Sequence, residues 1–211
     1  MPDQELQQLK LPVVDGESTL IVKRSRFIAA IRRMDLATDA QPLLKKIEQE
    51  YPKANHYCWA YRYGLDRIEE HCSDAGEPAG TAGRPILGAL KRSGFNNTLV
   101  VVVRYFGGIK LGVRGLIDAY GAAAEQVIEE IGFEMVDLTD TLFFRVPYDV
   151  YSSLMARMLR LNIKQEYILA HFEERVWGNA LIPRSKRDQL NDFLEEWQQR
   201  GDVELEWDEK Q

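Results

Sequence analysis

The sequence concentrates basic residues in two stretches that contain no acidic residue. One stretch runs from 78 to 117 and contains Arg84, Lys91, Arg92, Arg104, Lys110 and Arg114. The other runs from 18 to 34 and contains Lys23, Arg24, Arg26, Arg32 and Arg33. Because side chains alternate along a strand, Arg24, Arg26 and Arg32 should share one strand face. In a chain with 33 acidic and 27 basic residues, this separation predicts a positive surface patch. The alternative is a set of charges spread over solvated surface, as charge runs often are.

Two glycine-rich loops, 80–83 and 107–115, lie in the first of these stretches, and each precedes an expected helix. Helix N-termini and exposed backbone N–H groups attract anions, and glycine lets a phosphate approach the backbone closely. Alternatively, the glycines only make tight turns. Neither loop has the pattern of a P-loop or of a dinucleotide-binding site. The predicted phosphate- or nucleic-acid-binding residues are Lys23, Arg24, Arg26, Gly80, Thr81, Gly83, Arg84, Arg104, Tyr105, Gly107, Gly108, Lys110 and Arg114.

Side chains next to these loops could add stacking or acid–base chemistry. Tyr105 and Phe106 end an apolar run, and they could stack on bases or close a strand as core residues. Asp74 and Glu77 are the only acids in the loop that leads into the first basic stretch. A carboxylate pair there could hold a magnesium ion or act as a general base. The same pair could instead bind Arg84 or organise the loop.

Residues of the types that bind zinc also occur in this part of the chain. His56 and Cys58 should share a strand face, and His71 and Cys72 follow nearby. No C-x-x-C or H-x-x-x-H pair completes a set of four ligands, so we predict no metal and no cofactor. A Cys–His nucleophile pair has no orienting third group, and both cysteines are expected to be free thiols.

Length and charge favour two domains in a cytoplasmic protein. The chain has 211 residues and a formal charge of −6. Residues 1–136 hold 17 basic and 18 acidic residues, whereas residues 137–211 hold 10 and 15. The sequence has no apolar run of about 18 residues, and residues 1–5 do not resemble a secretory signal. We therefore expect a cytoplasmic location and no membrane partner.

Hydrophobic periodicity predicts an α/β domain over residues 1–136. The expected strands are 17–35, His56–Tyr63 and Leu99–Val103, of which the last should be buried on both faces. The expected helices are 38–51, one that begins near Arg84, and one that includes Leu116–Ile131. Residues 72–83 are expected to be loop.

Residues 137–211 are predicted to form a separate ferredoxin-like domain with the element order βαββαβ. The expected strands are Thr141–Val146, Lys164–Phe172, Arg175–Ile182 and Asp202–Trp207. The expected helices are Tyr148–Leu161 and Ser185–Arg200. In the last strand Val203, Leu205 and Trp207 alternate with acids, which indicates one core face and one solvated face. The predicted fold class of the whole chain is α+β.

Two long motifs surround the glycine-rich loops. The first, Ser73–Leu87, reads SDAGEPAGTAGRPIL, and the second, Val101–Gly112, reads VVVRYFGGIKLG. With these motifs the chain closely resembles the IMPACT/YigZ family over its whole length, although Ala75 stands where a second Asp is expected. The resemblance implies an N-terminal domain like the second domain of a ribosomal small-subunit protein. It also implies a C-terminal domain like the last domain of elongation factor G.

The resemblance further implies a connection with translation. Eukaryotic relatives regulate translation by competing for a scaffold that activates an initiation-factor kinase, but they carry an additional N-terminal domain that is not expected here. We predict a non-enzymatic RNA- or ribosome-binding regulator, with a translation-related protein as a further possible partner. One alternative is an enzyme acting on a small phosphorylated substrate or nucleotide, with Asp74 or Glu77 as the base. Another is a protein–protein adaptor, which exposure of Trp177, Trp197 or Trp207 would favour.

Overall fold

The computed structural model describes residues 7–34, 40–65, 67–201 and 203–208. The chain divides into two compact units, which are Leu9–Val136 and the part from Asp137 onward together with the N-terminal residues up to Gln8. Residues 1–5 and the expected helix start at 38–39 lie outside the described residues. Among the helices of the described part, none is long and apolar enough to cross a membrane.

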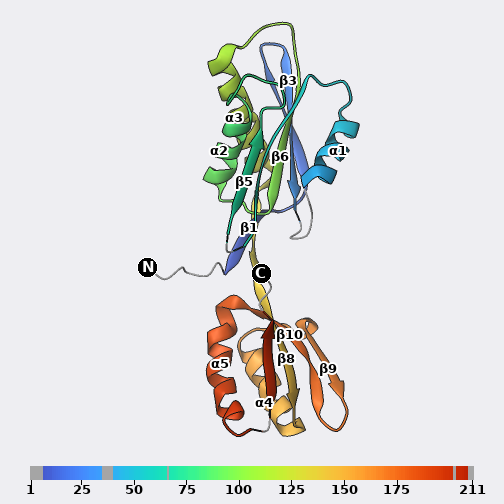
Figure 1. The fold of residues 1–211 in the computed structure, drawn as a ribbon, viewed down its shortest axis with the longest axis vertical. Coiled ribbons are helices and arrows are strands. Elements are labelled where there is room, and N and C mark those ends of the chain that lie inside the picture. The colour runs from blue at the N-terminus through green and yellow to red at the C-terminus, as the bar shows by residue number, and fades with distance from the viewer. Residues whose placement is uncertain (1–6, 35–39, 66, 202, 209–211) are drawn as a thin grey trace. The chain divides into compact units, whose positions relative to one another are not determined.

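The N-terminal unit is built on a five-stranded antiparallel sheet with helices on both faces. The order in the sheet is β2-β3-β6-β4-β5. Its strands are β2 (Gly16–Val22), β3 (Ser25–Arg33), β4 (His56–Tyr63), β5 (Glu69–Ser73) and β6 (Thr98–Tyr105). As Figure 1 shows, one face carries α2 (Gly83–Ser93) and α3 (Gly112–Ile131), and the other carries α1 (Ala40–Glu50). Strands β1 (Gln8–Pro12) and β7 (Phe133–Asp137) pair in a separate two-stranded sheet.

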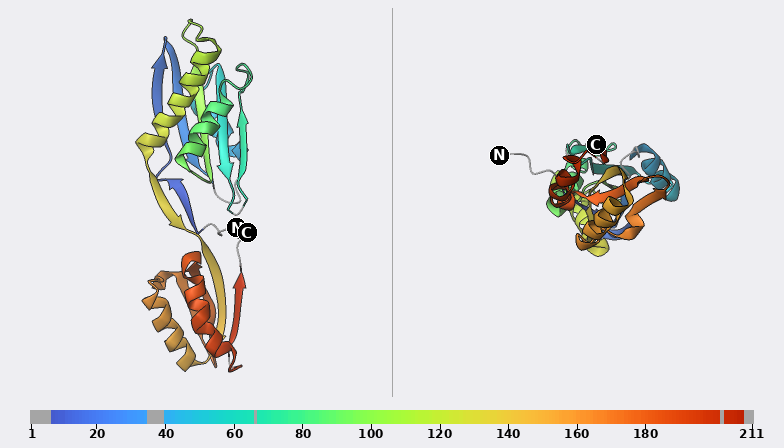
Figure 2. Two further views of the ribbon diagram at one scale, coloured as in Figure 1. Left: turned by 90° about the vertical axis from the view of Figure 1, so that its left-hand side faces the viewer. Right: turned by 90° about the horizontal axis from the view of Figure 1, so that it is seen from below.

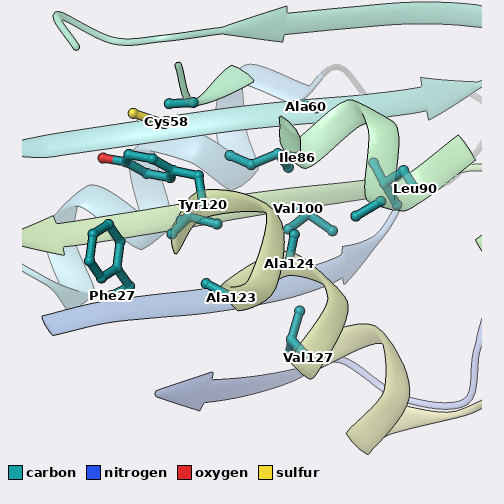
Figure 3. Close-up of a cluster of buried hydrophobic side chains, with 14 of the residues drawn as sticks. Phe27, Cys58, Ala60, Ile86, Leu90, Val100, Tyr120, Ala123, Ala124 and Val127 are labelled. Carbon is teal, nitrogen blue, oxygen red and sulfur yellow. The ribbon is translucent and has the colours of Figure 1, made fainter. Parts of the chain in front are cut away.

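Strand β6 has the continuous apolar run that is expected of a central strand. Val100 and Val102 point into the core that the sheet forms with α2 and α3, whereas Leu99, Val101 and Val103 pack toward α1. Figure 3 shows the first of these cores, in which α3 lies against the sheet. Burying a Val or Leu side chain completely stabilises a fold by about 1.5–3 kcal/mol. Packing on both faces therefore holds the end of β6, and the loop that follows it, in a defined position.

Strands β2 and β3 form a hairpin rather than the single strand region that was predicted. Val22 pairs with Ser25 across a two-residue turn. Both turn residues, Lys23 and Arg24, have a positive φ, at 43° and 67°. This backbone is typical of the primed turns whose twist matches a hairpin. Arg24 therefore lies in the turn, and the prediction that it shares a strand face with Arg26 was wrong.

The C-terminal unit is a four-stranded antiparallel sheet in the order β11-β8-β10-β9. Its elements are β8 (Thr139–Val146), α4 (Tyr148–Arg160), β9 (Ile168–Phe172), β10 (Val176–Pro183), α5 (Arg184–Gln198) and β11 (Glu204–Asp208). Leu154 of α4 and Leu190 of α5 belong to the same buried core as Phe144 and Ala180 of the sheet. Both helices therefore cover the same face, and Figure 2 shows them side by side. The element order is the predicted βαββαβ.

Candidate functional site

Loops that are far apart in the sequence meet at one end of the five-stranded sheet. The β2–β3 turn lies beside the end of β6, where Arg26 pairs with Tyr105. Figure 1 shows the hairpin and the loop before α3 at this same end of the unit. Six exposed basic residues lie on these segments and at the start of α2, and we call them the cationic end: Lys23, Arg24, Arg26, Arg84, Lys110 and Arg114. Exposed cations from both acid-free stretches therefore share one end of the unit, whereas Arg32, Arg33, Lys91 and Arg92 pair with acids elsewhere.

Gly107 joins the hairpin to the loop that follows β6. Its backbone N–H donates a hydrogen bond to the hydroxyl of Ser25 at 3.2 Å. A Cβ at Gly107 would lie only 2.1 Å from the carbonyl carbon and oxygen of Arg24. Glycine is required here because another part of the backbone approaches so closely. The close approach at Gly107 is therefore between two protein segments, and Gly108, with a φ of +84°, has open space around it.

The N-terminus of α3 can attract an anion at the cationic end. The helix begins at Gly112, has no acidic residue in its first turn, and has no side chain that caps its first N–H groups. The positive end of the helix dipole therefore lies beside the exposed side chains of Lys110 and Arg114. Arg114 also forms an ion pair with Asp118 at 3.1 Å, but its side chain remains 87% exposed.

The N-terminus of α2 already has an anionic partner within the protein. The carboxylate of Asp74 accepts hydrogen bonds from the backbone N–H groups of Gly80, Ala82 and Gly83 at 2.7, 2.9 and 2.8 Å. Burial alone would raise the pKa of Asp74, but these three donors hold it below its ordinary value. The N–H groups of Gly80 and Gly83, predicted to face phosphate, are thus occupied. The buried hydroxyl of Thr81 similarly donates to the carbonyl oxygen of Pro78.

Arg104 is a buried residue, contrary to the expectation that it reaches phosphate. Its side chain is 6% exposed and forms a 2.6 Å ion pair with Glu77, whose side chain is 4% exposed. The same Glu77 oxygen accepts a hydrogen bond from the hydroxyl of Tyr120 at 2.8 Å. The Nε atom of Arg104 is buried and has no hydrogen-bond partner among the described residues. The contacts of Asp74 and Glu77 are therefore those of residues that organise a loop. This is the structural role considered for them, as distinct from metal binding or acid–base chemistry.

Cys58 and His56 lie next to this ion pair but do not form a nucleophile–base pair. Burial raises the pKa of Cys58 to about 12, and its thiol donates to the carbonyl oxygen of Asp74 at 3.0 Å. Figure 3 shows Tyr120 between Cys58 and the ring of Phe27. His56 lies 3.8 Å from the Glu77 carboxylate. In the part of the chain that the structure describes, no group of His, Cys, Asp and Glu is arranged to hold a metal ion.

The two aromatic residues after Arg104 differ in how much ring surface they offer. Tyr105 has the guanidinium of Arg26 over its ring at 4.6 Å, and its hydroxyl donates to the carbonyl oxygen of Pro52. Phe106 also has a guanidinium over its ring, that of Arg104 at 5.4 Å, but it is 45% exposed and its ring has no hydroxyl that a hydrogen bond could hold. Phe106 is therefore the better placed of the two to stack on a base, although only Tyr105 was included among the predicted binding residues.

Sequence reasoning missed the role of Asp74 as the cap of α2 and the pairing of Glu77 with Arg104. Two signals were available. The position before α2 is Ala82, which has no capping side chain, so an acceptor from another segment was needed. Arg104 follows Val102 by two positions in a strand, so its side chain should point toward the same buried core.

The sequence matches a protein-family model and several relatives that belong to the same family. Residues 23–128 match the family model described as the Impact N-terminal domain. An IMPACT family member of Haemophilus influenzae is 44% identical over 124 residues, which are 58% of this chain and 60% of that protein. The IMPACT family member YigZ of Escherichia coli is 41% identical over 112 residues, which are 52% of this chain and 55% of that protein. The chain thus spans little more than half the length of these relatives.

A solved structure resembles the chain over nearly its whole length. It is described as the crystal structure of a hypothetical protein, and it superimposes with a TM-score of 0.68 at 28% sequence identity. The match covers 98% of this chain and all of the other chain. The mixed α/β arrangement of helices and antiparallel sheets therefore has a precedent among solved structures.

Proposed function

Because the chain belongs to the IMPACT family, we propose that it binds RNA, free or within the ribosome, through the cationic end of its N-terminal unit and without catalysing a reaction. The translation role that was inferred from the family resemblance is part of this proposal. A cytoplasmic location, where RNA and ribosomes are found, is also part of it.

The observation that carries the proposal is the position of six exposed cations at one end of a single sheet. The acids of the neighbouring loop are already engaged, since Asp74 caps α2 and Glu77 pairs with Arg104. These six cations outnumber the nearby acids Asp74, Glu77 and Asp118, although the whole chain carries a formal charge of −6. Lysine, arginine and the start of α3 would contact phosphates, and Phe106 would stack on a base.

The contacts of Asp74 and Glu77 support binding over the enzyme alternative. Asp74 has a carboxylate that accepts three backbone N–H groups, and Glu77 is buried against Arg104 and Tyr120. A general base must reach the proton it removes from a substrate. Neither carboxylate is free to do so in this arrangement, which favours binding over catalysis.

The test is the dependence of RNA affinity on salt. A fluorescent oligouridine and purified ribosomes serve as the two probes, with affinity measured by anisotropy and by co-sedimentation. Each cation that contacts a phosphate contributes about one unit to the slope of log K against log salt. The variants Arg24→Ala, Lys110→Ala and Arg114→Ala should therefore each weaken binding and lower that slope by about one.

The matched control is Lys46→Ala, which removes an exposed cation of α1 outside the cationic end. It should leave both the affinity and the slope unchanged. The proposal fails if the protein binds neither probe, or if Lys46→Ala weakens binding as much as Arg24→Ala. It also fails if affinity does not change between low and physiological salt.

A further inference from the structure

The four-stranded sheet of the C-terminal unit exposes large apolar side chains on the face opposite its helices. Alternate residues of β8, β9 and β10 point into the core formed with α4 and α5. The residues between them include Phe143, Leu169 and Trp177, which are 44%, 57% and 41% exposed. Burying such side chains is favourable, so an apolar face of this size indicates an interaction surface.

The register of the strands arranges this face in rows. Trp177 on β10 is paired with Arg145 on β8 and with His171 on β9. Its indole stacks on the imidazole of His171, with ring centroids 4.2 Å apart. Phe143 of β8 lies two residues from Arg145 and therefore on the same face, where it is paired with Asn179. An open hollow of about 680 Å³ has Phe143, Arg145 and Trp177 in its lining, together with residues of β11.

The edge strand β11 adds carboxylates to the same face. Glu204 is paired with Arg145, Glu206 with Phe143, and Asp208 with the next alternate residue of β8. All three acids are exposed, while Leu205 and Trp207 between them pack against the core. Arg145 and His171 are basic residues of this face, and Arg175, just before β10, forms an ion pair with Glu204 at 3.9 Å. An aromatic centre therefore lies beside an acidic edge.

We propose that this face binds a basic segment of another protein. An arginine or lysine of the segment stacks on the side of the Trp177 indole that His171 does not cover, where the ring attracts a cation, and a second one pairs with Glu206. Apolar side chains of the same segment cover Phe143 and Leu169. Glu206 and Asp208 distinguish this occupant from a nucleic acid, because their carboxylates would repel phosphates at short range. The inference is independent of the RNA-binding proposal, which concerns the other unit.

The experiment is an NMR titration of the isotope-labelled full-length chain with three probes. The first is a blocked hexapeptide of alternating arginine and leucine, the second its glutamate–leucine counterpart, and the third an oligouridine. The arginine peptide should shift the Trp177 indole signal with a Kd of about 1 mM or tighter. Trp177→Ala removes this reporter, so its affinity is followed through the backbone amide signals of β10, and the arginine peptide should bind about tenfold more weakly or worse, as expected for an aromatic anchor. Glu206→Gln should weaken this binding several-fold and reduce its dependence on salt.

The matched control is Leu159→Ala, which removes an equally exposed apolar side chain from α4. It should bind the arginine peptide like the unmodified chain, as should Arg24→Ala in the other unit. The proposal is overturned if the arginine peptide produces no shift of Trp177, or if Trp177→Ala and Leu159→Ala bind it equally. It is equally overturned if the glutamate peptide binds as well, or if oligouridine shifts the Trp177 signal and the arginine peptide does not.

Discussion

Removing either partner of the Arg104–Glu77 ion pair should strongly destabilise the N-terminal unit. Two opposite charges at about 4 Å attract by about 4 kcal/mol at the effective dielectric of partly buried protein sites. In Arg104→Met the Glu77 carboxylate keeps only its bond from Tyr120, and in Glu77→Gln the buried guanidinium loses its counter-charge. Loss of one partner of a buried pair costs roughly 3–5 kcal/mol. This corresponds to a fall of roughly 10–20 °C in the melting midpoint.

The double variant Arg104→Met/Glu77→Gln separates the ion pair from the side chains themselves. It leaves no uncompensated charge, so its cost should be smaller than the sum of the two single costs by about 2–3 kcal/mol. Urea denaturation followed by circular dichroism gives the free energy of unfolding. Hydrogen exchange of peptides from β6 assigns the transition to the N-terminal unit. Arg114→Met is the control, because its ion pair with Asp118 is exposed and should contribute less than about 1 kcal/mol.

Two results would refute this reasoning. The first is that each single variant lowers the free energy of unfolding by less than about 1 kcal/mol and that the double variant shows the sum of the two effects. Such additivity would contradict the coupling expected between neighbouring charges in a buried pair. The second concerns RNA. A buried Arg104 does not contribute to the salt slope, so folded Arg104→Met should keep the slope of the unmodified chain. A decrease of about one unit in that slope would place Arg104 on a phosphate.

Three further predictions concern the cap of α2, the glycines after β6 and the two cysteines. Asp74→Asn should lower the free energy of unfolding by about 1–2 kcal/mol at neutral pH. Both oxygens of the Asp74 carboxylate accept hydrogen bonds, whereas an amide has only one accepting oxygen. The pKa of Asp74 is lower in the folded than in the unfolded protein. The carboxylate therefore stabilises the fold fully above the unfolded pKa of about 3.9, and this stabilisation is lost as the pH falls through the folded pKa. The gap between variant and unmodified chain, measured by urea denaturation, should therefore close in acid. Gly107→Ala should lower stability by about 1–3 kcal/mol and also weaken RNA binding, because the new Cβ displaces the hairpin. Gly108→Ala meets no atom and should cost about 1 kcal/mol for its backbone conformation alone. An aromatic disulfide reagent should titrate the exposed Cys72 in the native protein and reach Cys58 only after unfolding, because Cys58 is buried and burial raises its pKa to about 12.

Elements with a strong hydrophobic period could be predicted from the sequence. The strand His56–Tyr63 has the predicted bounds, and α4 ends one residue before its predicted end. Helix α3 begins at Gly112, four residues before the stripe of apolar residues that identified it. Apolar periodicity marks the part of a helix that packs, and it does not mark a first turn that remains exposed.

Strands with little apolar surface could not be predicted. Strand β5 (Glu69–Ser73) is the edge of its sheet and consists mainly of polar and charged residues, so it has no run of β-branched residues to reveal it. The turn Lys23–Arg24 was missed because primed turns usually contain glycine or asparagine. Both errors arise where backbone hydrogen bonding with a neighbouring strand overrides local preference.

The sequence indicated which residue types form the candidate site, but it did not predict the hydrogen bonds and ion pairs that these residues make. The acid-free stretches contain the six cations that gather at one end of the sheet, but also basic residues that pair elsewhere, such as Arg33 with Glu134. Which of them are exposed depends on pairing between distant segments, such as the ion pair of Arg104 with Glu77. The occupation of the Gly80 and Gly83 amides by Asp74 likewise depends on how the loop folds back on itself.

The β2–β3 turn has two cationic residues at positions where its backbone conformation is unfavourable for them. Two successive left-handed positions are most easily formed by asparagine and glycine, whereas Lys23 and Arg24 occupy them at a cost of roughly 1 kcal/mol or more each. Lys23→Asn combined with Arg24→Gly should therefore raise the melting midpoint while it weakens binding to RNA. The turn therefore holds two long cationic side chains on a backbone that other residues would form at a lower cost in free energy.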